Sequence, residues 1–264
     1  MKTVISRELG KRGGRKVLVP YLTCGFPSMC SFEKLALEVC DAGIDMIEIG
    51  FPFSDPLADG PTIQYSSKTA LENGFKLGKG FASIEMIARS TNIPIIVMTY
   101  LNTVRAMGET KFLRQCRKAG VSGLVIPDLP AYLSDNIGRA CKEFCIDLAL
   151  LVAPTTPVER IKRIAEQSMG FLYLVSVKGT TGKRDRFPSG TLSFIKRVKR
   201  LSPIPVLVGF GISSPAMAAE AARLSDGVII GSALIEIIRR NGNKGKASKR
   251  LKLFLQSIKK EMNS

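Results

Sequence analysis

Eight short apolar runs recur at regular intervals along the chain, and this repetition constrains the fold more than any other feature. Each run is bounded by Gly, Pro or Asp and is almost continuously apolar, which is typical of strands buried on both faces of a parallel sheet. The runs cover residues 17–22, 46–49, 93–98, 123–126, 148–152, 172–175, 206–208 and 227–230.

Segments with helical periodicity separate these runs. They cover residues 32–42, 81–90, 110–119, 133–144, 157–166, 192–199, 215–222 and the chain from 235 onward. Eight strand–helix units, without a linker or a shift in composition, predict an α/β protein in which residues 1–264 form a single (β/α)8 TIM barrel. An open doubly wound sheet is the alternative, but the number of units and the lack of a Gly-rich dinucleotide fingerprint after the first run favour the barrel.

Both ends of the chain are expected to add to the barrel. Residues 1–16 are basic and contain glycines, and they predict an N-terminal extension without the apolar core of a signal peptide. Towards the other end, apolar residues recur at helical spacing with Lys and Arg between them, which predicts an amphipathic closing helix with a basic, solvated face. These apolar residues are Leu251, Phe254, Leu255 and Ile258.

Composition excludes several classes of chemistry. The chain has no histidine, which excludes Ser-His-Asp and Cys-His nucleophiles and His-ligated zinc. The six cysteines form no C-x-x-C pair, so the sequence predicts no metal site. No stretch reaches the roughly 20 apolar residues of a membrane span. The sequence therefore predicts a reduced, cytoplasmic protein that does not enter a membrane.

The formal net charge is +17, from 39 basic and 22 acidic residues. Such a chain attracts anions in general, including phosphorylated metabolites, nucleic acids and acidic proteins. Because no nucleic-acid-binding module is recognisable, we expect only non-specific, salt-sensitive attraction to nucleic acid.

Glu48 is an acid inside an otherwise apolar strand. Its alternation with Ile47 and Ile49 predicts that the carboxyl faces the barrel interior, where an unpaired charge is costly. A carboxyl in such a place has a raised pKa and can exchange protons near neutral pH. The alternative is a structural Glu that a neighbouring hydroxyl or Lys satisfies.

Asp59 follows in a loop that Pro52, Pro56 and Pro61 stiffen. Because catalytic residues of such barrels lie at the carboxyl ends of the strands, this loop is expected to bring Asp59 over the pocket to face Glu48. Two carboxyls in unlike environments are suited to acid–base catalysis. Asp55, in the same loop, is interpreted from the local sequence as a turn cap.

Glycines follow the last two strands, at Gly209, Gly211 and Gly231-Ser232. At this position backbone N–H groups and a helix N-terminus commonly bind phosphate in barrels of this kind. The polar segment 178–185 after the sixth strand is interpreted as a lid, in which Thr181 could hydrogen-bond a carboxylate; an ordinary exposed loop is the alternative.

The residues around these positions resemble the tryptophan synthase alpha chain family. The stretch EIGFPFSDPLADGPTIQ at 48–64 closely resembles the family signature. Shorter similarities, VPYLT at 19–23, PDLP at 127–130, YLVS at 173–176 and GFGISS at 209–214, follow in the right order over essentially the whole chain. The resemblance implies a (β/α)8 barrel that cleaves indole-3-glycerol phosphate to indole and glyceraldehyde 3-phosphate. It also implies an αββα complex in which indole passes to a beta chain that carries pyridoxal phosphate, with no cofactor in this chain.

The resemblance also implies roles for individual positions. Glu48 and Asp59 fall on the catalytic glutamate and aspartate of the family. Substrate-binding positions fall on Tyr21, Ile63, Met98, Tyr100, Val125, Tyr173, Thr181 and Phe210. Phosphate-binding positions fall on Gly182, Gly211, Gly231 and Ser232. Positions that face the beta chain fall on Asp55, Pro56 and Asn102.

Some positions depart from the family pattern, chiefly Phe26, Val177-Lys178, Thr180 and Ala131-Tyr132. None of them is Glu48 or Asp59, so the departures concern lid closure and coupling to the beta chain. The alternative function is therefore a catalytically weakened subunit that is retained to activate the beta chain.

Overall fold

Parallel strands form the centre of the molecule. The computed structural model describes residues 3–11, 13–175, 187–209, 211–241 and 246–264. Its strands are β1 (Val17–Thr23), β2 (Ile47–Gly50), β3 (Ile95–Met98), β4 (Val121–Val125), β5 (Asp147–Ala149), β6 (Leu151–Val152), β7 (Leu172–Val175), β8 (Val206–Gly209) and β9 (Gly227–Ile230). Each of the eight predicted apolar runs overlaps at least one of these strands.

The strands form a nearly closed barrel in the order β5-β4-β3-β2-β1-β9-β8-β7-β6, and all pairs are parallel. The fifth predicted strand is interrupted at Leu150, so that β5 pairs with β4 whereas β6 pairs with β7. One segment of chain therefore joins the two ends of the sheet, and the predicted (β/α)8 barrel is confirmed over the open alternative.

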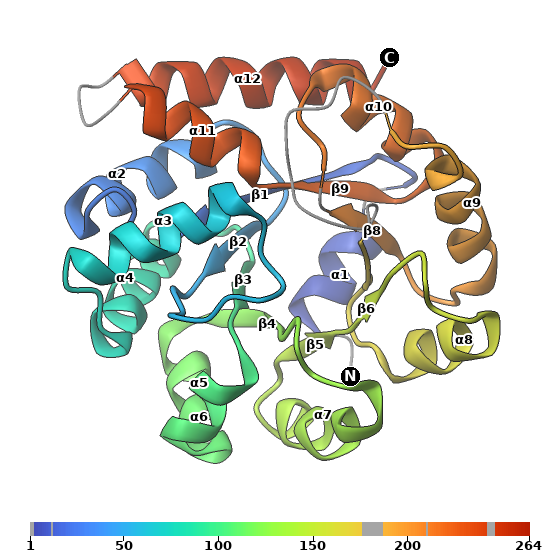
Figure 1. The fold of residues 1–264 in the computed structure, drawn as a ribbon, viewed down its shortest axis with the longest axis horizontal. Helices are drawn as coiled ribbons and strands as arrows, with labels where there is room; N and C mark the ends of the chain where they lie inside the picture. The colour runs from blue at the N-terminus through green and yellow to red at the C-terminus, as the bar shows by residue number, and fades with distance from the viewer. Residues whose placement is uncertain (1–2, 12, 176–186, 210, 242–245) are drawn as a thin grey trace.

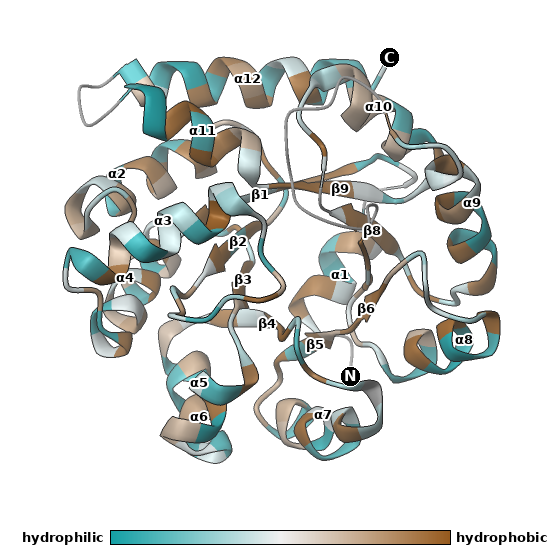
Figure 2. Ribbon diagram, viewed as in Figure 1, coloured by the Kyte–Doolittle hydropathy of each residue, from teal (hydrophilic) through white to brown (hydrophobic). Residues whose placement is uncertain are grey.

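Helices surround the strands in Figure 1. They are α1 (Val4–Gly10), α2 (Met29–Cys40), α3 (Pro61–Glu72), α4 (Leu77–Ser90), α5 (Leu101–Met107), α6 (Glu109–Ala119), α7 (Ser134–Glu143), α8 (Val158–Gln167), α9 (Thr191–Leu201), α10 (Pro215–Leu224), α11 (Ser232–Asn241) and α12 (Lys246–Met262), with a short 3-10 turn at Ala131–Leu133. Figure 2 shows apolar strands and helices with one apolar and one polar side, so the core lies in the barrel and beneath the helices.

Each predicted helical segment overlaps one of these helices, and the predicted closing helix is confirmed as α12. Leu251, Leu255 and Ile258 are buried along one side of α12, while Phe254 is half-buried. Helices α1, α3 and α5 were not among the predicted segments.

The predicted N-terminal extension contains α1, which covers the amino ends of the strands. Ile5 is 1% exposed and lies where a Cβ on Gly123 or Gly170 would meet it. The Thr3 hydroxyl donates a hydrogen bond of 2.5 Å to Asp147 at the start of β5. This helix therefore closes the floor of the barrel and leaves the carboxyl ends of the strands as the accessible face. No helix in the described ranges is long and apolar enough to cross a membrane.

Candidate active site

The strand register places Tyr21 and Glu48 side by side inside the barrel. Tyr21 of β1 pairs with Glu48 of β2, and Glu48 pairs with Ile96 of β3. Register partners on neighbouring parallel strands point to the same face of a sheet. Glu48 therefore lies among interior side chains, as its alternation with apolar neighbours predicts.

Glu48 is 1% exposed, and within the described part of the chain neither of its carboxyl oxygens has a hydrogen-bond partner. Burial raises its pKa to about 8 from an ordinary value of 4.5, and the charge of Asp59 adds to the effect. Burial acts in this direction because the interior penalises the charged form. At neutral pH Glu48 is thus predominantly protonated and can donate a proton.

Asp59 lies in the loop between β2 and α3 and lines the same cavity as Glu48. Its backbone N–H donates to the Pro56 carbonyl at 3.0 Å, and the Gln64 side-chain amide donates to the Asp59 carbonyl at 2.9 Å. These bonds turn the loop back over the barrel.

Burial raises the pKa of Asp59 to about 6, and a hydrogen bond from the Tyr100 hydroxyl opposes this rise. The Tyr100 oxygen also accepts a bond of 3.1 Å from the Ala58 N–H, so the phenol orients both the loop and its carboxylate. Asp59 is consequently ionised at pH 7, while Glu48 is not. Their environments separate the two carboxyls into one acid and one anion.

Two tyrosines fill the space beside Glu48, and glycines on neighbouring strands make room for them. A Cβ on Gly50 would overlap the Tyr21 hydroxyl, and a Cβ on Gly209 would overlap the Tyr173 ring. The Tyr21 oxygen accepts a bond of 3.4 Å from Thr23, whose hydroxyl is 2.6 Å from that of Ser66 on α3. This connection ties the cavity wall to α3.

The cavity at the carboxyl ends of the strands gathers most of the described candidate residues. Its lining consists of Tyr21, Glu48, Asp59, Ile63, Met98, Tyr173, Gly211, Ile212, Ile229, Gly231 and Ser232. Tyr100 is not in this lining but contacts the site by its hydrogen bond to Asp59. Val125 is the register partner of Met98, is fully buried and is also not in this lining. Sequence reasoning missed Ile212 and Ile229, although Ile229 shares the inward phase of its strand with Gly227 and Gly231.

The candidate phosphate site lies at the N-terminus of α11. The Gly231 carbonyl accepts bonds from the N–H groups of Leu234 (2.8 Å) and Ile235 (3.1 Å), so Gly231 directly precedes the helix. The first N–H groups of a helix have no intrahelical partner and attract anions. Gly211 adopts φ 78°, a conformation that favours glycine. The other candidates of the lid and phosphate region, Thr181, Gly182 and Phe210, lie outside the described residues.

The candidate partner residues lie in the loop after β2 (Asp55, Pro56) and in the first turn of α5 (Asn102). Asp55 and Asn102 are exposed, and Pro56 is half-buried. Phe53 stacks on Tyr100 with ring centroids 5.0 Å apart, which joins the loop after β2 to the start of α5. The three residues are therefore supported by the same tyrosine that contacts Asp59.

The described residues include no group of three or more His, Cys, Asp or Glu side chains placed to hold a metal ion. The chemistry that these residues themselves offer is proton donation by a buried acid and charge stabilisation by a neighbouring anion, beside a helix N-terminus that can bind phosphate.

Comparison with known proteins gives a consistent family. Residues 8–263 match the family model described as tryptophan synthase alpha chain. A tryptophan synthase alpha chain from Methanocaldococcus jannaschii is 43% identical over 242 residues, which cover 91% of this chain and 86% of the relative. The corresponding protein of Roseiflexus castenholzii is 44% identical over 88% of this chain and 89% of its own.

Solved structures agree with this assignment. A structure of Mycobacterium tuberculosis tryptophan synthase superposes with a TM-score of 0.91 at 32% identity, and the match covers 100% of both chains. A structure of the tryptophan synthase a2b2 complex from Pyrococcus furiosus has a TM-score of 0.86 at 38% identity, with 92% of this chain and 97% of the other covered. On the strength of the matching family model and of relatives more than 40% identical over most of its length, this chain belongs to the tryptophan synthase alpha chain family.

Proposed function

We propose that this chain is the alpha subunit of a tryptophan synthase and cleaves indole-3-glycerol phosphate to indole and glyceraldehyde 3-phosphate. The observation that carries the proposal is the pair of buried carboxyls in one cavity, with Glu48 unpaired and of raised pKa beside an ionised Asp59. A retro-aldol cleavage needs an acid and a base at the reacting carbons and an anion near the positive charge that develops. Glu48 supplies the acid and the base in turn, and Asp59 supplies the anion.

Glu48 acts first as the acid and then as the base. Its protonated carboxyl donates a proton to carbon 3 of the indole ring, which leaves a carboxylate and a positively charged ring. The carboxylate then takes the proton of the glycerol hydroxyl as the carbon–carbon bond breaks. The bonding electrons return to the ring, the hydroxyl carbon becomes the aldehyde, and Glu48 is again protonated. A pKa near the working pH suits a group that must perform both steps.

The Asp59 carboxylate accepts a hydrogen bond from the indole N–H and stabilises the positive charge that develops on the ring. Its anionic form is required for this role, which fits a pKa of about 6. The backbone N–H groups at Gly211, Gly231 and Ser232 would bind the phosphate together with Gly182. The substrate would be surrounded by Tyr21, Ile63, Met98, Tyr100, Tyr173, Thr181 and Phe210, while Val125, the buried register partner of Met98, would support the cavity wall. The chain needs no cofactor of its own for these steps.

The partner that we propose is a tryptophan synthase beta chain in an αββα complex. The a2b2 complex of the Pyrococcus furiosus relative supports this assembly. Asp55, Pro56 and Asn102, on the accessible face of the barrel, would contact the beta chain. Pyridoxal phosphate would belong to the beta chain, and the complex would work in the cytoplasm.

The test is the release of indole from indole-3-glycerol phosphate, measured for the chain alone and with its cognate beta chain. We expect weak activity that rises sharply when the partner is added. Indole in neither case, together with activation of the beta chain, would overturn the proposed cleavage and indicate a subunit that only activates its partner.

A further inference from the structure

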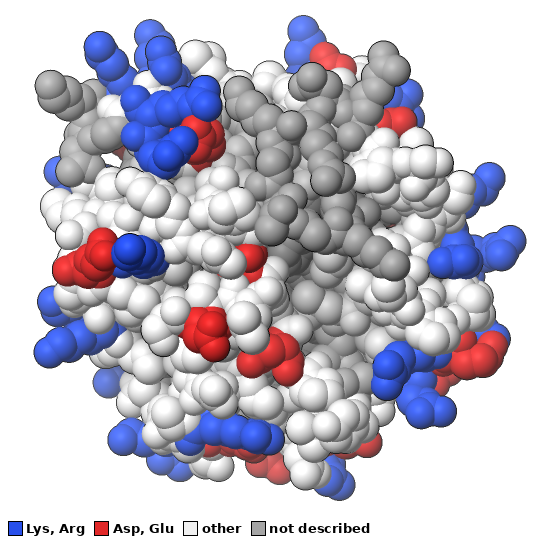
Figure 3. Space-filling model, in the orientation of Figure 1, with Lys and Arg blue, Asp and Glu red and all other residues white. Residues whose placement is uncertain are grey.

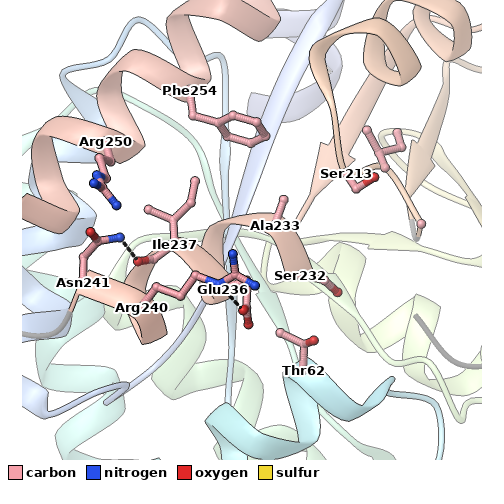
Figure 4. Close-up of a pocket in the computed structure, with 12 residues that line it drawn as sticks. Thr62, Ser213, Ser232, Ala233, Glu236, Ile237, Arg240, Asn241, Arg250 and Phe254 are labelled. Atoms are coloured by element: carbon pink, nitrogen blue, oxygen red, sulfur yellow. Dashed lines mark hydrogen bonds and ion pairs between the residues drawn. The ribbon is translucent and has the colours of Figure 1, made fainter. Parts of the chain in front are cut away.

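A second hollow lies outside the barrel, directly beside the candidate active site. It is a groove of about 500 Å³ between α3, α11, α12 and the segment after β8 (Figure 4). The groove is lined by Thr62, Gly211, Ile212, Ser213, Ser232, Ala233, Glu236, Ile237, Arg240, Asn241, Arg250 and Phe254.

The groove and the catalytic cavity share a wall. Gly211, Ile212 and Ser232 line both of them. Ser232, Glu236 and Arg240 follow one another at four-residue spacing along α11, so the groove runs about 12 Å from the candidate phosphate site to the end of that helix. A ligand in the groove could therefore move to the shared wall without leaving the protein surface.

Positive charge dominates the groove. Glu236 is already paired with Arg239 at 2.9 Å and with Arg240 at 2.5 Å, so its carboxylate is more than neutralised. Arg250 reaches the groove from α12, and Figure 4 shows it pointing towards Asn241 at the end of α11. Within the described part of the chain no carboxylate pairs with Arg250. Figure 3 shows Lys and Arg side chains gathered over α11 on this face of the molecule.

Basic residues begin α12 without an acidic residue beside them. Lys246, Lys249 and Arg250 lie in the first two turns of α12, and its first turn contains no acidic residue. The N-terminal end of a helix carries partial positive charge and favours anions over cations. The helix dipole therefore does not favour Lys246 and Lys249 in the first turn, and an anion bound between α11 and α12 would compensate for the positive charge at this end of the helix.

The remaining lining is apolar on one side and hydroxylic on the other. Ala233, Ile237 and the half-buried Phe254 provide the apolar side, and Thr62, Ser213 and Ser232 provide hydroxyls. Guanidinium groups recognise phosphate through several hydrogen bonds at once. The lining thus matches a phosphate monoester with an apolar body better than it matches an inorganic ion alone.

We propose that this groove is a second binding site for phosphate monoesters, at which Arg250 and Arg240 hold the phosphate of the substrate before it reaches Gly211 and Ser232. The inference rests on the proposed function, since it takes the substrate of that reaction as its ligand. Charge in such a groove raises the local concentration of an anionic substrate and its association rate, and salt weakens the effect.

The test compares Arg250→Gln with Lys252→Gln in the complete complex. Both residues are exposed and both variants remove one positive charge from α12, but only Arg250 lines the groove. For Arg250→Gln we expect kcat/KM for indole-3-glycerol phosphate to fall about fivefold at 20 mM salt and less than about twofold at 200 mM, with kcat unchanged. Lys252→Gln should stay within about 1.5-fold of the wild type, and Arg250→Lys should restore most of the loss.

Equal values of kcat/KM for Arg250→Gln and Lys252→Gln at both salt concentrations would overturn the proposal. A fall in kcat without a change in KM would also overturn it, because it would indicate a distorted active site rather than a lost binding site. Wild-type protein that releases no indole would instead overturn the proposed function.

Calorimetry with phenyl phosphate, a monoester with an apolar body, and with inorganic phosphate tests the groove without turnover. We expect two sites for the ester in the wild-type chain and one in Arg250→Gln, with inorganic phosphate weaker at the second site. Identical titrations of the two proteins would show that no second site exists. Equal affinity of the ester and inorganic phosphate at the second site would overturn the proposed contact between Phe254 and the apolar body of the ester.

Discussion

Each end of the barrel buries a carboxyl in the interior, but only the carboxyl at the floor has a hydrogen-bond partner among the described residues. At the floor, Asp147 is 1% exposed and accepts a hydrogen bond of 2.5 Å from Thr3, which precedes α1. At the carboxyl end, Glu48 is equally buried, yet neither of its oxygens has a partner in the described part of the chain. Burial alone therefore does not distinguish a structural acid from a reactive one.

The presence or absence of a hydrogen-bond partner distinguishes the two carboxyls. Burial raises the pKa of Asp147, and the bond from Thr3 lowers it again, so the floor partly compensates its carboxylate. For Glu48, among the described residues, the charge that acts on the carboxyl is the like charge of Asp59, which raises its pKa further. A buried polar group without a partner costs stability, and such a cost is typical of functional sites. The contrast assigns stability to one end of the barrel and chemistry to the other.

The largest expected effect is the loss of activity in Glu48→Gln. The amide is nearly the same size but cannot donate a proton to carbon 3 or take one from the hydroxyl, so we expect indole release to fall by about a thousandfold or more. The fold should be kept, as measured by circular dichroism.

Asp147→Asn is the matched control, since it also changes one buried interior carboxyl to an amide. Its indole release should stay within about threefold of the wild type, because no step of the chemistry uses the floor. Comparable losses in the two variants would show that the two ends do not divide stability and chemistry in this way.

The second effect is the pH dependence of stability. A folded-state pKa of about 8 for Glu48, against 4.5 as the ordinary value, means that the folded protein binds more protons than the unfolded chain between these values. The free energy of unfolding should therefore fall as the pH rises through this range, with a slope of at most about 1.4 kcal/mol for each pH unit from this one group.

Glu48→Gln removes this contribution, so its urea unfolding should depend less on pH. Relative to the wild type, the variant should be most stable above pH 8 and gain least below about pH 4.5. The raised pKa of Asp59 acts in the same sense in both proteins and cancels in the comparison. Parallel curves for the two proteins from about pH 5 to about pH 9 would contradict the raised pKa of Glu48.

The third expected effect is a loss of stability when the contact between Thr3 and Asp147 at the floor of the barrel is removed. In Thr3→Val the hydroxyl that serves Asp147 is lost, together with the N-cap of α1, because the same oxygen accepts from the Ser6 N–H. We expect the free energy of unfolding to fall by about 2 kcal/mol in urea titrations. Thr3→Ser keeps both bonds and should lose much less. Neither variant should change the KM for substrate; a raised KM in Thr3→Val would mean that the floor shapes the site.

The contrast between the two ends could be predicted only in part. The eight strands are recognisable because each is apolar on both faces, and the inward phase of Glu48 follows from alternation. Helix α1 was missed because it buries only Ile5, and its packing against Asp147 depends on a contact between residues 144 positions apart. Long-range pairing of this kind leaves no periodic signal in the sequence.

Helices α3 and α5, near the site, were also missed because neither has a continuous apolar stripe; α5 buries only Leu101 and Val104. Helix α3 buries Ile63 and Ala70, but also Ser66 and Ser67, so its buried face is not a continuous apolar stripe. Ser66 can be buried because its hydroxyl donates to the Ile63 carbonyl and contacts that of Thr23. The sequence thus predicts that Asp59 lies in a loop, and the family resemblance places Tyr100 near the substrate, whereas the hydrogen bond by which Tyr100 orients Asp59 could be found only from the structure.

The smallest effect tests that orientation. Tyr100→Phe removes the hydrogen bond that lowers the pKa of Asp59 while keeping a ring that can stack on Phe53. The pKa of Asp59 should rise above about 6, so the acid limb of the pH profile of kcat should move up by about half to one pH unit. At pH 8, where Asp59 stays ionised, the loss of kcat should be no more than about threefold.

Tyr21→Phe is the matched control. It removes a phenol hydroxyl that lies in the same cavity but does not bond Asp59, so the acid limb of its pH profile should stay in place. If both variants shift the limb equally, the Tyr100 hydroxyl has no special part in keeping Asp59 ionised, and the separation of the two carboxyls depends on burial alone.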